Sequence, residues 1–122
     1  MFARPKTVFL VSRDWQSRAL LRAQLIEEGL RVKAYLSASE AAESVGSKAR
    51  GAALVVADVS APAARDEIDT LSALARRVPV WVIASRTSAG EAALRAQGFE
   101  AIVFRPVTLG ELAARVKQRL LR

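Results

Sequence analysis

The hydrophobic positions of this chain form five short apolar runs, and a stretch with helical spacing follows each run. The runs lie at residues 7–11, 31–36, 52–57, 79–84 and 101–104. Three of them are continuously apolar, which is typical of strands buried on both faces of a parallel sheet. The second run alternates, because Val32, Ala34 and Leu36 fall on one face and charged or aromatic residues on the other. That alternation predicts an edge strand.

The stretches between the runs carry the start and stop signals of helices. In the first stretch, Arg18, Leu21 and Leu25 recur at helical spacing, and Gly29 is placed to end the helix. The last stretch has a single apolar stripe, made of Leu109, Leu112, Val116 and Leu120. Three helices open with a capping box, in which a hydroxyl and a carboxylate satisfy free backbone amides. The boxes are Ser37 with Glu40, Ser88 with Glu91, and Thr108 with Glu111.

The strict alternation of strand and helix predicts an α/β fold. We expect one domain, residues 1–122, with a five-stranded, parallel, doubly wound sheet and five helices on its two faces. In such sheets a ligand or reactive group lies at the carboxyl ends of the strands. Asp58 ends the third run and is followed at once by Ser60 and Pro62. Asp58 is therefore the first candidate for a functional residue.

The composition removes several classes of site. The 122 residues include no cysteine and no histidine, so thiol chemistry, disulfides and the commonest general base are all excluded. No nucleophile elbow is present either, and we expect a protein that is not an enzyme. The longest apolar runs are too short to span a bilayer, and the start lacks a secretion signal. These features favour a cytoplasmic protein without membrane contact.

The net charge of +7 raises the question of an acidic partner. The basic residues are spread along the whole chain, and only residues 115–122 form a local cluster. Direct binding of nucleic acid needs a concentrated patch, and for single strands it also needs exposed aromatic residues. Nucleic-acid binding is accordingly the weakest of the functions considered.

From Val8 to Leu120, the order of landmarks resembles the receiver domain of two-component response regulators. The landmarks are the first-helix residues from Arg18 to Gly29, Asp58 followed by Pro62, Pro79 before the fourth strand, and Pro106 after the fifth. The resemblance implies the flavodoxin-like strand order 2-1-3-4-5. It also implies protein partners such as a histidine kinase, a phosphotransfer protein or an output domain, and a possible homodimer through the fourth and fifth helices.

The resemblance assigns roles by position. Asp58 matches the aspartate that accepts a phosphoryl group, and Ser60 falls where a backbone carbonyl reaches the family's magnesium ion. Pro106 matches a cis proline. Other positions depart from the family pattern: the acidic pair falls on Ser12 and Arg13, the Thr/Ser position on Ala84 with Ser85 after it, the lysine position on Arg105, and the aromatic switch position on Ile102.

These departures predict a pseudo-receiver, because neither Ser12 nor Arg13 can serve as an anionic magnesium ligand. We expect no metal and no other cofactor. Our hypothesis is that a guanidinium, from Arg105 or Arg13, takes the place of the metal charge and keeps Asp58 ionised. Arg86 lies in a neighbouring strand-end loop. We expect Asp14 to cap the first helix, Trp81 to lie in the core and Trp15 to pack at the start of that helix.

Three alternatives stay open on the same residues. Asp58 could still accept a phosphoryl group despite the altered surroundings. The arginines near the strand ends could instead bind a small anion such as phosphate, although no glycine-rich phosphate loop is present. The mixed-charge surface of the fourth and fifth helices suits either a partner or a dimer contact. Its residues are Glu91, Arg95, Glu100, Glu111, Arg115, Lys117 and Arg119.

Overall fold

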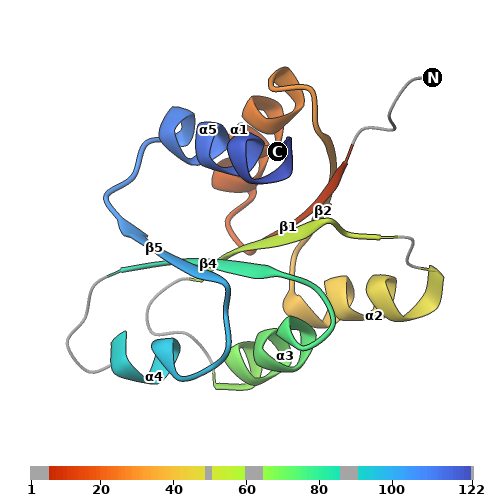
Figure 1. Cartoon of the computed structure of the whole chain (residues 1–122), viewed down its shortest axis with the longest axis vertical. Coiled ribbons are helices and arrows are strands. Elements are labelled where there is room, and N and C mark those ends of the chain that lie inside the picture. The colour runs from red at the N-terminus through yellow and green to blue at the C-terminus, as the bar shows by residue number, and fades with distance from the viewer. Residues whose placement is uncertain (1–5, 49–50, 60–64, 86–90, 122) are drawn as a thin grey trace.

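The computed structural model describes residues 6–48, 51–59, 65–85 and 91–121. Its centre is a five-stranded parallel sheet in the order β2-β1-β3-β4-β5 (Figure 1), which confirms the expected order. The strands are β1 (Thr7–Ser12), β2 (Arg31–Tyr35), β3 (Leu54–Asp58), β4 (Val80–Ser85) and β5 (Ala101–Arg105). The helices are α1 (Trp15–Glu27), α2 (Ala38–Lys48), α3 (Arg65–Ala75), α4 (Glu91–Arg95) and α5 (Leu109–Leu120).

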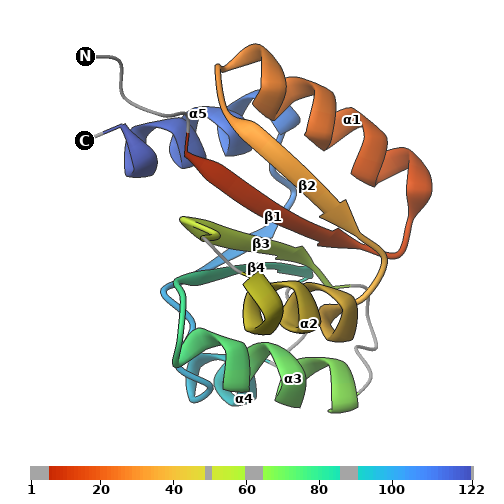
Figure 2. The same cartoon turned by 90° about the vertical axis from the view of Figure 1, so that its right-hand side faces the viewer.

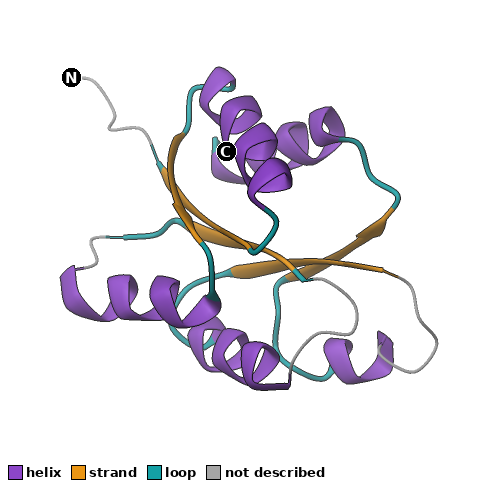
Figure 3. Cartoon of the chain, turned by 180° about the vertical axis from the view of Figure 1, so that it is seen from behind, coloured by secondary structure: helices purple, strands orange, loops and turns teal. Residues whose placement is uncertain are grey.

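Helices cover both faces of the sheet. Helices α1 and α5 lie on one face, and α2, α3 and α4 lie on the other (Figures 1 and 2). The same three layers are visible from behind in Figure 3, with the strands between the two groups of helices. As predicted from its alternating pattern, β2 is an edge strand, and β5 forms the other edge. None of the helices in the described part of the chain is both long and apolar enough to cross a membrane.

Each face of the sheet has its own apolar core, because successive side chains of a strand point to opposite faces. The core under α1 and α5 includes Leu10, Leu54, Trp81 and the α5 stripe. The core on the other face includes Phe9, Val55, Val82 and residues of α2 and α3. Trp81 is buried, as predicted, whereas Trp15 is 70% exposed and the prediction that it packs was wrong. At 100° per residue, position 15 lies off the buried stripe of Leu21 and Leu25.

Helix α1 begins and ends where the sequence predicts. Asp14 is its N-cap and accepts hydrogen bonds from the backbone N–H of Ser17 at 3.0 Å and from the Ser17 hydroxyl at 2.5 Å. At the other end, Gly29 has a φ of +88°, and the amides of Gly29 and Leu30 donate to the carbonyls of Ile26 and Leu25. This is the Schellman pattern, which needs a residue with positive φ. The chain is thereby turned into β2.

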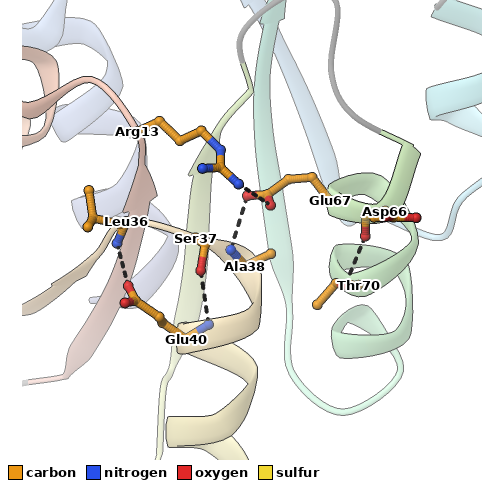
Figure 4. Close-up of polar contacts among 8 residues, drawn as sticks. All are labelled: Arg13, Leu36, Ser37, Ala38, Glu40, Asp66, Glu67 and Thr70. Carbon is orange, nitrogen blue, oxygen red and sulfur yellow. Dashed lines mark hydrogen bonds and ion pairs between the residues drawn. The ribbon is translucent and has the colours of Figure 1, made fainter.

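Two of the three predicted capping boxes can be compared with the structure. The amide of Glu40 donates to the Ser37 hydroxyl at 3.2 Å, and the Glu40 carboxylate accepts from the amide of Leu36 at 2.9 Å (Figure 4). Thr108 accepts from the amide of Glu111 at 3.0 Å at the start of α5. The third box includes Ser88, which lies outside the described residues.

Candidate functional site

The carboxyl ends of the strands bring four of the predicted site residues to one edge of the sheet. Ser12, Asp58, Ser85 and Arg105 are the last residues of β1, β3, β4 and β5. Ser12 lies directly beside Asp58 in the register of β1 and β3, and Ser85 lies beside Arg105 in that of β4 and β5. The parallel sheet therefore assembles this edge from segments that are far apart in the sequence.

Arg105 forms an ion pair with Asp58 through its Nη2 atom and the carboxylate Oδ1 atom. The side chains are partly buried, with 36% of Arg105 and 16% of Asp58 exposed. A second nitrogen of the same guanidinium, Nη1, donates to the backbone carbonyl of Val59 at 3.4 Å. Burial lowers the pKa of Arg105 from its ordinary value, because a desolvated cation is less favourable. A fixed positive charge thus lies against the carboxylate at the end of β3.

Ser12 fills the position beside Asp58 with a neutral group. Its hydroxyl donates to Asp58 Oδ2 at 3.4 Å and also lies 3.3 Å from the carbonyl of Asp14. Its own carbonyl accepts a 2.7 Å hydrogen bond from Nη1 of Arg18. Ser12 is only 2% exposed. The side chain therefore supports the Asp58 carboxylate by a hydrogen bond and adds no negative charge.

Arg13 does not pair with Asp58, so of the two arginines that the hypothesis offered as alternatives, only Arg105 makes this contact. Its guanidinium makes a 3.4 Å ion pair with Glu67 of α3. The Glu67 carboxylate also accepts a 3.0 Å hydrogen bond from the amide of Ala38 at the start of α2 (Figure 4). The physical reason is the alternation of side chains, since Ser12 is directed toward the α1 face and the next residue toward the opposite one.

Glu67 was missed by the sequence analysis. It lies in the first turn of α3, where an acidic residue is common because it interacts favourably with the helix dipole. That signal indicates a helix start and says nothing about a contact with α2 or with the loop after β1. Long-range pairing of this kind has no local sequence pattern.

Of the remaining predicted residues, two lie on strands, one follows a cis peptide bond and two lie outside the described residues. Ala84 is buried in the core under α2 and α3, and Ile102 is half-buried on β5. The peptide bond between Arg105 and Pro106 is cis, as the resemblance implied. Ser60 and Arg86 lie outside the described residues.

An open pocket of about 530 Å³ lies beside the ion pair, between α1, α5 and the ends of β3, β4 and β5. We refer to it as the α1–α5 pocket. It is lined by Ser17, Leu21, Asp58, Ile83, Arg105, Pro106, Val107, Leu109 and Leu112. Most of these side chains are apolar, and Asp58 and Arg105 supply the charged part of the lining.

The donor set near Asp58 does not fit a magnesium ion. Within the described ranges, no group of three or more acidic side chains is placed to hold a metal. Magnesium prefers an octahedral shell of carboxylates and water. Here the carboxylate of Asp58 contacts a guanidinium and a hydroxyl, and Asp14 caps α1. That no magnesium binds stays a prediction.

Comparison with known proteins links this arrangement to one fold. No family model and no curated protein matches the sequence. Among solved structures, the chain is similar to the chemotaxis protein CheY4 of Vibrio cholerae, with a TM-score of 0.78, 19% identity, and coverage of 96% of this chain and 100% of that one.

Two further structures give the same result. A CheY-like response regulator receiver domain protein from Methanospirillum hungatei has a TM-score of 0.77 and 16% identity, over 96% of this chain and 94% of that chain. An orphan response regulator of H. pylori has a TM-score of 0.77 and 20% identity, over 94% of this chain and 96% of that chain. At these identities the similarity concerns the fold.

Proposed function

We propose that this chain, which has the fold of CheY-like response regulator receiver domains, is a receiver-like signalling module without normal magnesium-dependent phosphorylation. It acts by protein–protein contacts and catalyses no reaction of its own. The observation that carries the proposal is the ion pair between Arg105 and Asp58, with neutral Ser12 beside it.

The chemistry of phosphoryl transfer supports this reading. A carboxylate that attacks phosphorus must be held in line while a cation neutralises the charge that develops on the phosphoryl oxygens. In this chain one carboxylate oxygen of Asp58 contacts Arg105 and the other accepts from the Ser12 hydroxyl. Loss of the metal charge would cost several kcal/mol of transition-state stabilisation, or roughly a thousandfold or more in rate. We infer that Asp58 holds the ends of β1, β3 and β5 together and does not turn over.

The surface offers features for partner contacts. Large apolar side chains of α1 are exposed, namely Trp15, Leu20 and Ile26. At 100° per residue, Trp15 and Ile26 fall on the same side of α1 and Leu20 on another, so they are separate exposed side chains that a partner could cover and not one apolar patch. At the β5 edge of the sheet, α4, β5 and α5 present mixed charges around small apolar residues, which suits a partner or a homodimer contact. A histidine kinase, a phosphotransfer protein or an output domain in the cytoplasm would be such a partner.

Intact-mass measurement after incubation with magnesium and acetyl phosphate tests the proposal. We expect no phosphoryl adduct on the wild-type chain. A matched variant restores the family pattern with Ser12→Asp, Arg13→Asp and Arg105→Lys, and we expect an adduct on it that Asp58→Asn abolishes. An adduct on the wild-type chain, absent from its Asp58→Asn variant, would overturn the proposal.

A second candidate is a functional phosphoacceptor, favoured by the position of Asp58. This residue ends β3, keeps 16% of its side chain exposed and lines an open pocket, so a small donor could reach it. The two candidates differ in their need for magnesium. Because Trp15 is exposed at the start of α1, a magnesium-dependent change in its fluorescence would favour the second candidate.

A further inference from the structure

The α1–α5 pocket combines an apolar wall with one charged region, a combination that is typical of small-molecule sites. Its volume of about 530 Å³ lies within the range of about 300 to 1,000 Å³ of ligand pockets. The apolar wall comes from both helices, with Leu21 of α1 and Leu109 and Leu112 of α5. Ile83 of β4 lies in the same lining, and Asp58 and Arg105 supply its charges.

The guanidinium of Arg105 has donors to spare. An arginine carries five N–H groups. Within the part of the chain that the structure describes, Nη2 contacts Asp58, and Nη1 reaches the carbonyl of Val59 at the long distance of 3.4 Å. Nε makes no hydrogen bond to a described residue. A second acceptor group in the pocket would therefore find unused donors on Arg105.

We propose that the α1–α5 pocket binds a small organic carboxylate with an aliphatic body. The carboxylate accepts hydrogen bonds from Arg105, and the aliphatic part lies against Leu21, Leu109 and Leu112. Arginine and carboxylate form planar, charge-assisted pairs, which gives the ligand one orientation. The inference goes beyond the signalling proposal and does not depend on it, since it rests on the pocket and on Arg105.

The charges that line the pocket, Asp58 and Arg105, pair with each other, so the preference for an anion rests on the hydrogen-bond donors of Arg105 that this pair leaves free. The carboxylate of Asp58 already has Arg105 and the Ser12 hydroxyl as partners. The guanidinium of Arg18 lies close by, where it donates to the Ser12 carbonyl at 2.7 Å, and Asp14 is engaged by the amide and hydroxyl of Ser17. A second carboxylate would give the free N–H groups of Arg105 acceptors that Asp58 and Val59 do not supply.

Three probes with the same aliphatic chain test the inference: octanoate, octanol and octylamine. Each is titrated into the isotopically labelled wild-type chain and followed through the backbone amide signals in two-dimensional NMR spectra. We expect octanoate to bind most tightly, about tenfold more tightly than octanol, because it adds a charged hydrogen bond. The shifted signals should be those of Leu21, Ile83, Leu109 and Leu112.

Two variants assign the two parts of the site. Arg105→Gln should remove the preference for octanoate over octanol. Leu109→Phe narrows the pocket and should weaken all the probes together. Arg115→Gln is the matched control for Arg105→Gln, since Arg115 is an exposed arginine of α5 that lies outside the α1–α5 pocket. It should bind all three probes like the wild type.

Several results would overturn the inference: equal affinity for octanoate and octanol in the wild-type chain, tightest binding of octylamine, or signal shifts that map away from the pocket. Unchanged octanoate preference in a folded Arg105→Gln variant would do the same. Near-ultraviolet circular dichroism checks that each variant keeps its tertiary packing. If Arg105→Gln does not fold, the comparison of the three probes on the wild-type chain and on Leu109→Phe still shows whether the pocket binds the aliphatic chain and prefers the carboxylate. Phosphorylation is measured separately by mass, so its outcome does not affect this test.

Discussion

The guanidinium of Arg105 lies against the carboxylate of Asp58, and each charge depends on the other for compensation. Removing one partner of a partly buried pair leaves a charge without its counterion. We expect Arg105→Gln and Asp58→Asn each to lower the free energy of unfolding by about 1 to 2 kcal/mol. The loss in the double variant should be smaller than the sum of the two single losses by about 1 kcal/mol, because the double variant contains no unpaired charge at these positions. Urea unfolding measures all three, and strictly additive losses would contradict the coupling.

Glu100, which directly precedes β5, is a second residue whose charge matters. Its carboxylate accepts two 2.8 Å hydrogen bonds from Arg119 and one of 2.7 Å from the indole of Trp81. The hydrogen bond from Arg119 is the main reason that the pKa of Glu100 lies below its ordinary value of 4.5, and Trp81 lowers it further, against the effect of burial. The folded state thus binds this proton less tightly than the unfolded state.

The stabilisation from Glu100 should therefore depend on pH. It is fully present above the unfolded pKa of about 4.5 and is lost as the pH falls through the lower folded pKa. Urea unfolding between about pH 6 and about pH 3 should show a steeper loss of stability for the wild-type chain than for Glu100→Gln. Emission from Trp81 should change over the same range. Parallel curves for the two proteins would show that Glu100 contributes nothing to the acid sensitivity.

At the scale of elements, Glu67 joins three segments that are separate in the sequence. It belongs to α3, accepts from Ala38 at the start of α2 and pairs with Arg13 in the loop after β1. The pair with Arg13 is exposed, and pairs of that kind contribute little to stability. The hydrogen bond to Ala38 satisfies one of the free amides of α2, which makes it the more valuable contact.

A pair of substitutions separates these two contacts. Glu67→Gln keeps an acceptor for Ala38 and loses the charge, so we expect a change in the free energy of unfolding of less than about 0.5 kcal/mol. Glu67→Ala loses both contacts and should cost about 1 to 2 kcal/mol, as the loss of a capping residue does. Chemical denaturation of both variants is the measurement. Equal losses would show that the charge, and not the capping, carries the effect.

At the scale of the whole molecule, the sheet divides the interior into two cores with one strand layer in common. Leu54 is fully buried in the core under α1 and α5, whereas Leu20 is exposed on the outer side of α1. Leu54→Ala should lower the free energy of unfolding by about 2 to 5 kcal/mol through lost burial and a cavity. Leu20→Ala, the matched control, should change it by less than about 0.5 kcal/mol. Thermal and urea unfolding give both values.

Much of this architecture could be predicted from the sequence, because it follows local rules. Apolar runs, capping residues and Gly29 predicted the strands, the helix boundaries and the order of the layers, and the position of Asp58 followed from the end of a run. The contacts made by Arg13 and Glu67 could not be predicted, since they join segments without a shared pattern. Trp15 was misjudged because large aromatic residues are usually buried, while its place on the helix put it outside the buried stripe.

The direction of α5 determines how the protein can be handled in the laboratory. Helix α5 starts just after Pro106, beside the Asp58 edge, and its 12 residues run back over about 18 Å toward the opposite edge. At that opposite edge Lys6 accepts a hydrogen bond from Arg31 at the start of β2, so both ends of the described chain lie there (Figure 2). A sensor chip or a fluorescent protein linked at either end would thus leave Asp58, Arg105 and the α1–α5 pocket facing the solution.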